Sequence, residues 1–445
     1  MNPYVDLVSG LRTAWVAGKT RTIEYRISQL EALGRFLDEK KQHILDAMAS
    51  DMRKTELSEI FLVRNEVNHA LNNLARPVTR CPHLLTLREP YGVVLIIGPW
   101  NYPLHLILVP LVGAIAAGES RTLPAWIPPS DPNLLQDCFA VVTGGPEVTS
   151  QLLENKFDYI FFTGSPHVGK IVMAAAAQHL TPLTLELGGK NPCYVADECD
   201  PQTVANRLVW GRCFNAGQTC LAPDYVLCSL ETQEKLMPAL RHAITEFFGP
   251  NPQESPDFAR IISDRHFQRI QALLGSGRVA IGGQTDEKER YVAPTVLLDV
   301  QPSEPAMQEE IFGPVLPIIT VANMDEAIAF INSRERPLAV YVFASNNKLV
   351  HRVLEQTSSG SFGGNDALMQ MMLVSLPFGG IGTSGLGSYH GKFSFDTFSH
   401  HRACLLRNMG LEAVNALRYP PYSDRKMGMV ASFSEIKRKG TCTLL

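Results

Sequence analysis

Hydrophobic residues recur along this chain in two different patterns. Between residues 20 and 54, apolar side chains return every three or four positions, as at Ile27, Leu30 and Leu33. This spacing predicts one or two amphipathic helices that cover other structure. Residues 93–97, by contrast, are a continuous aliphatic run that ends at a Gly-Pro pair, and an apolar helix-like stretch follows. A strand that is apolar on both faces is typical of a parallel sheet.

The order of strand and helix is repeated further along the chain. Residues 159–162 are predicted to form a second buried strand, and residues 170–179 a helix. Further strand-like runs, with helix-like segments between them, lie at residues 193–196, 225–228, 295–298 and 340–344. This alternation predicts an α/β protein with mainly parallel sheets in two lobes.

A turn of small residues precedes the predicted helix 170–179, with the sequence Gly164-Ser165-Pro166-His167-Val168-Gly169. Ser165 can cap the helix, and Pro166 suits its first turn. Small residues let backbone N–H groups approach a phosphate at a helix N-terminus, so the turn is a candidate nucleotide site. It lacks the GxGxxG fingerprint, and a plain tight turn is an equal alternative.

Composition narrows the class of protein. The chain has 445 residues, enough for two or three domains, with 45% hydrophobic and 19% charged residues and a net charge of −4. These values are typical of a globular enzyme and argue against disorder and against nucleic acid as a partner.

Cysteine usage and the apolar segments indicate the compartment. The nine cysteines form no CxxC pair and no zinc pattern, so we expect reduced thiols in the cytoplasm and no metal site. The N-terminus has no signal-peptide pattern. The longest apolar stretch, Leu106 to Gly118, contains Pro110 and is too short to cross about 30 Å of hydrocarbon. We therefore expect no membrane-spanning segment.

Two short stretches carry candidate chemistry. One is Leu-Glu-Leu-Gly-Gly with Glu186, and the other is Gly-Gln-Thr-Cys with Cys220. A nucleophilic cysteine needs a loop position, backbone donors and a nearby base. The turn at Gly217 supplies the first two and Glu186 the third. Taken singly, Cys220 is as compatible with an inert buried thiol, and Glu186 with a surface carboxylate.

Further motifs follow a fixed order around this pair. They are Gly-Pro-Trp-Asn-Tyr-Pro with Asn101, Glu-Glu-Ile-Phe-Gly-Pro with Glu310 and Phe312, and a glycine-rich loop that begins at Pro377 and continues through Gly387. Together with the two stretches above, in this order, they resemble the NAD(P)-dependent aldehyde dehydrogenase superfamily. The resemblance runs from about residue 10 to about residue 420.

The stretch at residues 391–400, Gly-Lys-Phe-Ser-Phe-Asp-Thr-Phe-Ser-His, and the long tail after it resemble class 3 of that superfamily, in the branch that acts on medium- and long-chain lipid-derived aldehydes. The resemblance implies a Rossmann-type NAD(P)-binding lobe at residues 1–187, with an oligomerisation strand region at about 78–92, and a catalytic lobe at 188–390. It further implies a bridging element at 391–422, a tail at 423–445 and a homodimer.

The resemblance also implies a role for each motif residue, with NAD or NADP as cofactor. Cys220 is expected to attack the aldehyde, and Asn101 with the Cys220 backbone N–H to bind the resulting oxyanion. Glu186 is expected to activate water for release of the acid. Glu310 and Phe312 are expected at the nicotinamide ribose and ring, and the turn from Gly164 to Gly169 at the pyrophosphate.

The last residues predict a lipid anchor. Cys442 stands fourth from the end in Cys-Thr-Leu-Leu, after the basic residues 437–439. This fits a geranylgeranyl-type CaaX box, although Thr443 is not aliphatic. One lipid with nearby basic residues gives reversible membrane binding. We therefore expect a cytoplasmic protein attached to the plasma membrane, the endoplasmic reticulum or a lipid-droplet surface.

One segment departs from the family pattern. Residues 119–132 hold four prolines and no lysine where the family has a strand, a lysine and a crossover helix, and residues 75–87 also look shortened. Loss of a strand–helix unit would weaken cofactor binding. Two alternatives therefore stand beside an active dehydrogenase: a membrane-tethered, weakened or inactive variant, and a cofactor-independent thiol hydrolase that uses Glu186 and Cys220.

Overall fold

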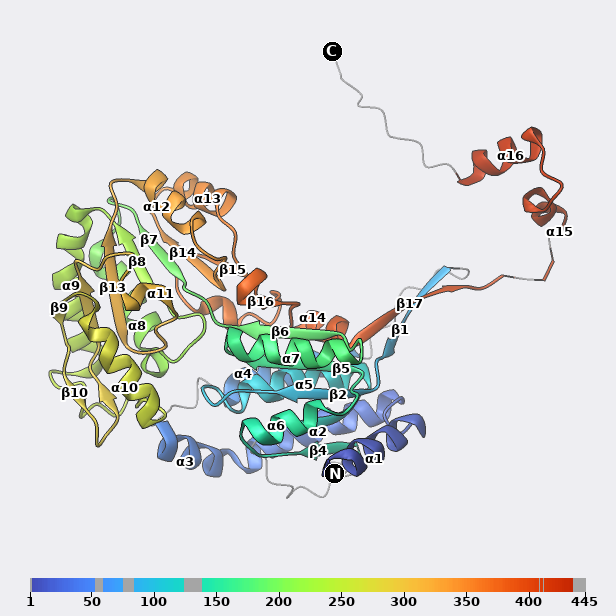
Figure 1. The fold of residues 1–445 in the computed structure, drawn as a ribbon, viewed down its shortest axis with the longest axis horizontal. Coiled ribbons are helices and arrows are strands. Elements are labelled where there is room, and N and C mark those ends of the chain that lie inside the picture. Colours follow the sequence, from blue (N-terminus) through green and yellow to red (C-terminus); the bar gives the residue numbers. More distant parts are fainter. Residues whose placement is uncertain are drawn as a thin grey trace, which may run out of the picture. The chain divides into compact units, whose positions relative to one another are not determined.

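The computed structural model describes residues 2–52, 59–74, 84–123, 138–407, 409–410 and 412–434. The chain divides into two compact units, residues 1–76 with 89–400 and residues 77–88 with 401–445. The first unit holds two large, mainly parallel sheets with helices on their faces (Figure 1). The predicted α/β class with parallel sheets is therefore confirmed.

The first sheet has six strands in the order β16-β6-β5-β2-β3-β4. All neighbours are parallel except β16 and β6. The strands are β2 (Val93–Ile97), β3 (Ser120–Leu123), β4 (Phe139–Val141), β5 (Tyr159–Gly164), β6 (Leu183–Leu187) and β16 (Gly385–Leu386).

Helices cover both faces of this sheet because its strands are apolar on both sides. In β2, Val93 and Leu95 pack with α1 (Val5–Val16), α6 (Pro146–Leu153) and α7 (Pro166–Gln178). Val94 and Ile96 belong to the core on the other face. That face carries α5 (His105–Ala117), backed by α2 (Ile23–Glu39), α4 (Ile60–Leu74) and α14 (Gly391–Thr397).

The segment that departs from the family pattern still supplies a strand. Ser120–Leu123 pairs in parallel with β2 on one side and β4 on the other, so the expected loss of a strand at residues 119–132 is wrong. Glu119, just before it, is buried, and its carboxylate accepts hydrogen bonds of 2.6 Å from the backbone N–H groups of Tyr91 and Gly92. Residues 124–137, where a crossover would lie, are outside the described residues.

The second sheet has seven strands in the order β15-β14-β7-β8-β13-β12-β9, and only β9 runs antiparallel to its neighbour. They are β7 (Pro192–Val195), β8 (Tyr225–Cys228), β9 (Arg278–Ile281), β12 (Thr295–Leu298), β13 (Val315–Thr320), β14 (Ala339–Phe343) and β15 (Ser361–Gly364). The helices of this lobe are α8 (Pro201–Cys213), α9 (Leu230–Phe248), α10 (Asp264–Leu273), α11 (Pro305–Gln308), α12 (Met324–Asn332) and α13 (Asn347–Gln356).

The remaining elements are short or peripheral. A small ladder joins β10 (Thr285–Asp286) to β11 (Tyr291–Val292), and β1 (Leu84–Pro90) pairs with β17 (Ser399–Leu405). Near the C-terminus lie α15 (Glu412–Asn415) and α16 (Asp424–Ser434). Among the described residues, no helix is both long and apolar enough to cross a bilayer.

Most predicted elements are confirmed to within a few residues. The strands at 93–97, 225–228 and 295–298 match, and the helix expected at 170–179 begins at Pro166. The apolar periodicity over 20–54 belongs to two helices, α2 and α3 (Lys41–Met52), which meet at Lys40. Amphipathic spacing alone does not mark this break, because the apolar stripe continues across it.

Candidate active site

Most of the predicted site residues line a single cavity of about 570 Å³ in the first unit. Those that line it are Asn101, Gly164, Ser165, Pro166, His167, Glu186, Cys220, Glu310 and Phe312. Val168 and Gly169 do not, because they lie inside the first turn of α7. A Cβ on Gly169 would come within 2.7 Å of Leu187 Cδ2, so this glycine permits α7 to pack closely on β6.

The strand ends of the first sheet explain why these residues meet. Asn101 follows β2, Ser165 follows β5, and Glu186 is the second-last residue of β6. The carboxyl ends of neighbouring parallel strands share one edge of a sheet, which is where ligands of open α/β folds bind. The Ser165 hydroxyl accepts a hydrogen bond of 3.4 Å from the Val168 N–H and caps α7, whose N-terminus opens into the cavity.

The turn before Cys220 has an unusual backbone. Helix α8 ends at Cys213, and in the 3-10 turn that follows, Asn215, Ala216 and Gly217 are left-handed, with φ of 56°, 50° and 74°. Left-handed residues other than glycine cost roughly 1–3 kcal/mol each and persist only where surrounding contacts hold them. A Cβ on Gly217 would clash with the carbonyl oxygen of Gly313.

A set of side-chain amides holds this nucleophile turn (residues 214–220). Asn215 donates to the carbonyl oxygens of Asn101 and Gln218, at 3.0 and 3.1 Å. Gln218 donates to the carbonyl oxygens of Asn215 and Arg260, both at 3.0 Å, and accepts the Ile262 N–H. These bonds offset the backbone strain and fix the turn that presents Cys220.

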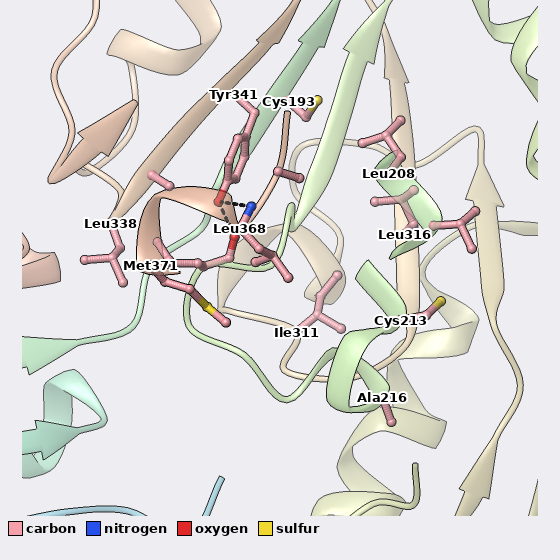
Figure 2. Packing of buried hydrophobic residues seen from close by; sticks show 14 of the residues in the cluster. Cys193, Leu208, Cys213, Ala216, Ile311, Leu316, Leu338, Tyr341, Leu368 and Met371 are labelled. Carbon is pink, nitrogen blue, oxygen red and sulfur yellow. Dashed lines mark hydrogen bonds between the residues drawn. The ribbon is translucent and has the colours of Figure 1, made fainter. Parts of the chain in front are cut away.

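The residues after the nucleophile are tied to the second sheet. Asn191 donates to the Cys220 carbonyl oxygen at 2.7 Å, and the Tyr341 hydroxyl donates to the Leu221 carbonyl oxygen at 2.7 Å. Figure 2 shows Tyr341 in the packed core that also contains Ala216 and Ile311. The loop that carries Cys220 is therefore held by polar contacts and by packing on the core.

Asn101 is buried and donates its side-chain N–H to the Gln218 carbonyl oxygen at 3.0 Å. An amide nitrogen carries two hydrogens. Asn101 therefore has the chemistry of an oxyanion donor beside Cys220.

The pKa values of Cys220 and Glu186 are both raised in this environment. Burial raises the pKa of the half-buried Cys220 thiol, and the carboxyl groups of Glu310 and Glu186 raise it further, while backbone N–H groups of Cys220 and Leu221 lower it. Burial also raises the pKa of Glu186 well above its usual value. Neither carboxyl oxygen of Glu186 has a hydrogen-bond partner among the described residues. Both shifts favour the neutral form of the group over the charged form.

Glu310 lies against the glycines that follow β6. A Cβ on Gly188 would clash with its carboxyl group, so only glycine leaves room for it. Burial raises the Glu310 pKa to about 8, and the charge of Asp224 adds to the shift, whereas Arg212, the Gly189 N–H and Lys190 oppose it.

Phe312 is another left-handed residue, with φ of 52°. Its ring meets Trp100 edge-on, with centroids 5.6 Å apart, and Trp100 in turn packs on His266 at 5.2 Å. These rings form an aromatic wall on the cavity.

Sequence reasoning missed four charged residues in and around the site. Asp224, Arg212 and Lys190 form a buried ion cluster, and Arg269 donates to the Glu310 carbonyl oxygen at 3.3 Å. Two of them could have been found from their positions in the sequence. Lys190 follows the Gly-Gly pair, and Asp224 directly precedes the buried strand β8. Charged residues at such points need partners, because burying an unpaired charge is costly.

The comparisons with known proteins agree with this geometry. The pattern of the aldehyde dehydrogenase family matches residues 12–123 and 133–404. AldH of Staphylococcus aureus, solved in a substrate-bound state, is 37% identical with a TM-score of 0.92, over 97% of this chain and 100% of that one. An aldehyde dehydrogenase of Mycobacterium tuberculosis, solved with NAD+, is 26% identical with a TM-score of 0.77, over 91% and 90%. The chain therefore belongs to the aldehyde dehydrogenase family.

Its relatives narrow the assignment. The chain is 59% identical to human aldehyde dehydrogenase family 3 member B1 over 100% of both chains, and 59% identical to mouse aldehyde dehydrogenase family 3 member B2 over 100% of this chain and 97% of the relative. It is thus a family 3 aldehyde dehydrogenase of the B type, and the predicted membership is confirmed. The family match leaves out residues 124–132, within the segment singled out from the sequence.

Proposed function

We propose that this enzyme oxidises medium- and long-chain, lipid-derived aldehydes to carboxylic acids with NAD or NADP, through a thioester on Cys220. The observation that carries the proposal is that Cys220, Glu186, Asn101 and Glu310 line one cavity together with the N-terminus of α7.

The residues of this cavity fit a dinucleotide. The turn from Gly164 to His167 and the start of α7 offer backbone N–H groups to a diphosphate. Glu310 offers carboxyl oxygens to a ribose, and Phe312 offers a ring face or edge to a nicotinamide. The relative from Mycobacterium tuberculosis, solved with NAD+, supports this choice of cofactor.

The chemistry begins at Cys220. The Cys220 thiol first loses its proton to water. Its sulfur then bonds to the aldehyde carbon, and the carbonyl oxygen becomes an oxyanion that Asn101 and the Cys220 N–H stabilise. Loss of one such donor typically costs about 3 kcal/mol. With a nicotinamide held beside Phe312 and Glu310, the hydride of this adduct would have an acceptor, and an acyl thioester would remain on Cys220.

Glu186 completes the turnover. Its carboxylate takes a proton from water, the resulting hydroxide attacks the thioester carbon, and the acid leaves as the Cys220 sulfur departs. Burial raises the pKa of Glu186, which makes its carboxylate a stronger base for this step.

A weakened variant is the second candidate, favoured by the interruption of the family match at residues 124–132. In the sequence this segment directly follows β3, a strand of the sheet whose edge is proposed to bind the cofactor. We expect a change in this segment to affect cofactor affinity more than the reactivity of Cys220, because Asn191 and Tyr341 of the second lobe hold the loop that carries Cys220.

Three readouts separate the candidates: NADH or NADPH formation from a long-chain aldehyde, cleavage of a p-nitrophenyl ester, and cofactor binding by calorimetry. We expect wild type to form reduced cofactor and Cys220→Ala to form none. Ester cleavage without reduced cofactor identifies a thiol hydrolase. Absence of both activities and of cofactor binding identifies the inactive variant. A rate that falls steadily from long to short aldehydes supports the lipid-derived substrate class.

Assembly and location are further proposals. We infer a homodimer through the bridging element at residues 391–422, and the lobe boundaries at residues 187 and 390 remain predictions. Light scattering of the purified chain tests the dimer. Membrane attachment rests on Cys442, which lies outside the described residues. If Cys442→Ser leaves the membrane-bound fraction in cells unchanged, the lipid anchor is wrong.

A further inference from the structure

A buried ion cluster borders the cavity, and one of its members, Lys190, lines the cavity itself. Arg212 Nη1 and Asp224 Oδ1 are 2.7 Å apart, and each side chain is only 2% exposed. Lys190 contacts the other carboxylate oxygen of Asp224. Taking such charges out of water costs several kcal/mol per ion, and an apolar replacement of the same shape is often neutral or stabilising. Stability alone therefore does not account for the cluster.

The cluster holds the turn at residues 310–313 on both sides of Phe312. On one side, the Ile311 N–H donates to the Asp224 carboxylate at 3.2 and 3.3 Å. On the other side, Arg212 donates through Nε at 2.7 Å, and also through Nη2, to the Gly313 carbonyl oxygen. Phe312 itself is left-handed, an uncommon conformation for a bulky residue that needs external support.

Arg212 also connects this turn to the nucleophile turn. It lies in the last turn of α8, which leads straight into residues 214–217. The Gly313 carbonyl oxygen that it binds is the atom that packs against Gly217. Within the described part of the chain, Asp224 makes no such contact with the nucleophile turn. The two members of the ion pair therefore differ in what they hold.

We propose that Asp224 and Arg212 are positioning residues for the cofactor side of the site: Asp224 holds Glu310 and Phe312 in place, and Arg212 holds that turn and the nucleophile turn together. The inference rests on the proposed function, since Glu310 and Phe312 are there assigned to the cofactor.

The test compares cofactor-dependent and cofactor-independent chemistry in the full-length enzyme. Asp224→Asn is expected to raise the KM for the cofactor and to slow aldehyde oxidation by about 10- to 100-fold. Cleavage of p-nitrophenyl acetate by Cys220 should stay within about twofold, because the nucleophile turn keeps its own bonds. Arg212→Met should lower both activities. Asp299→Asn, which removes an exposed carboxylate paired with Arg278, is the matched control and should change neither.

Equal loss of both activities in Asp224→Asn, or no loss in either, overturns the proposal. If Asp224→Asn does not fold, Arg212→Lys replaces it, since lysine keeps the charge but not the forked donors; it should slow both reactions.

A crystal structure of Asp224→Asn separates this inference from the proposed function, because it needs no activity. Phe312 is expected to leave the left-handed region and the Glu310 carboxyl group to move away from Gly188. An unchanged turn contradicts the positioning role, even where the wild type forms no reduced cofactor. Absence of reduced cofactor in wild type, with a displaced turn in Asp224→Asn, contradicts only the proposed function.

Discussion

Asn215 donates its side-chain amide to the backbone carbonyl oxygen of Asn101 at 3.0 Å. This bond joins the turn that carries the nucleophile to the loop after β2, so it links the two lobes at the point where the oxyanion donor and Cys220 must meet. The geometry of the site thus depends on an asparagine that is itself in a strained, left-handed conformation.

Replacement of Asn215 by alanine should therefore weaken both the fold and the site. We expect a loss of about 2 kcal/mol in the free energy of unfolding, because hydrogen bonds are lost and alanine tolerates the left-handed region less well. Alkylation of Cys220 and aldehyde oxidation should slow as well. Denaturant unfolding and the rate of iodoacetamide labelling measure these effects.

Asn365 provides the control for this variant. It is also left-handed, and its side chain exchanges two hydrogen bonds with Ala344 at 2.8 and 3.0 Å, but it does not line the cavity. Asn365→Ala should destabilise the protein to a similar extent and leave Cys220 labelling unchanged. Equal effects on labelling would show that the Asn215 bond has no special role.

Glu186→Gln should separate the two halves of the reaction. Loss of a general base typically costs 100- to 10,000-fold, so steady-state turnover should fall by about that factor. Hydride transfer does not need this base, and one equivalent of reduced cofactor per site should still form rapidly. Stopped-flow absorbance at 340 nm records both phases. Glu231→Gln, at an exposed glutamate, should behave as wild type, and loss of the burst in Glu186→Gln would place Glu186 before hydride transfer.

Glu66 should make the stability of the enzyme fall as pH rises. Its buried carboxyl group accepts the Gly391 N–H at 3.0 and 3.1 Å, and burial raises its pKa from 4.5 to about 7. Between pH 4.5 and about 7, the folded state therefore keeps a proton on Glu66 that the unfolded state has lost. The stability that this proton contributes is fully present below pH 4.5 and is lost as the pH rises through about 7. The shift corresponds to about 3 kcal/mol.

Unfolding free energies at pH 5 and pH 8 test this assignment. Glu66→Gln should lose about 3 kcal/mol less than wild type over that interval, while Glu231→Gln should follow wild type. The remaining decline belongs to other buried carboxyl groups, among them Glu310 with a pKa of about 8. A decline in Glu66→Gln as steep as in wild type contradicts the assignment.

Gly188→Ala should displace Glu310 without breaking the fold. The three atoms nearest to the added methyl group all belong to the carboxyl end of that side chain, which can rotate away. We expect a rise of about tenfold in the KM for the cofactor, a small change in Tm and normal ester cleavage. Gly275→Ala, where an added Cβ meets nothing within 4 Å, is the control. An unchanged cofactor KM would argue against a role for Glu310 in cofactor binding.

The sequence predicted the fold class and the residues of the cavity. Aliphatic runs such as residues 93–97 are apolar on both faces, and this property alone requires helices on both sides of a sheet. Asn101 and Ser165 were found because they follow buried strands, where parallel sheets bind ligands, and Glu186 was found from its Leu-Glu-Leu-Gly-Gly stretch as a base for Cys220. The prolines of residues 119–132 led to the wrong prediction that a strand is lost at 120–123. Pairing with β2 and β4 forms a strand there although the local composition argues against one.

The chemistry of this enzyme was thus determined by its sequence, through the identity and order of Cys220, Glu186, Asn101 and Glu310. Only the tertiary structure decided how these groups are held and in which direction their pKa values shift. The left-handed turns at residues 215–217 and 312 and the ion pair of Arg212 with Asp224 depend on contacts between distant segments. The raised pKa of Glu186 likewise depends on burial that the whole fold creates, and no local pattern of residues records it.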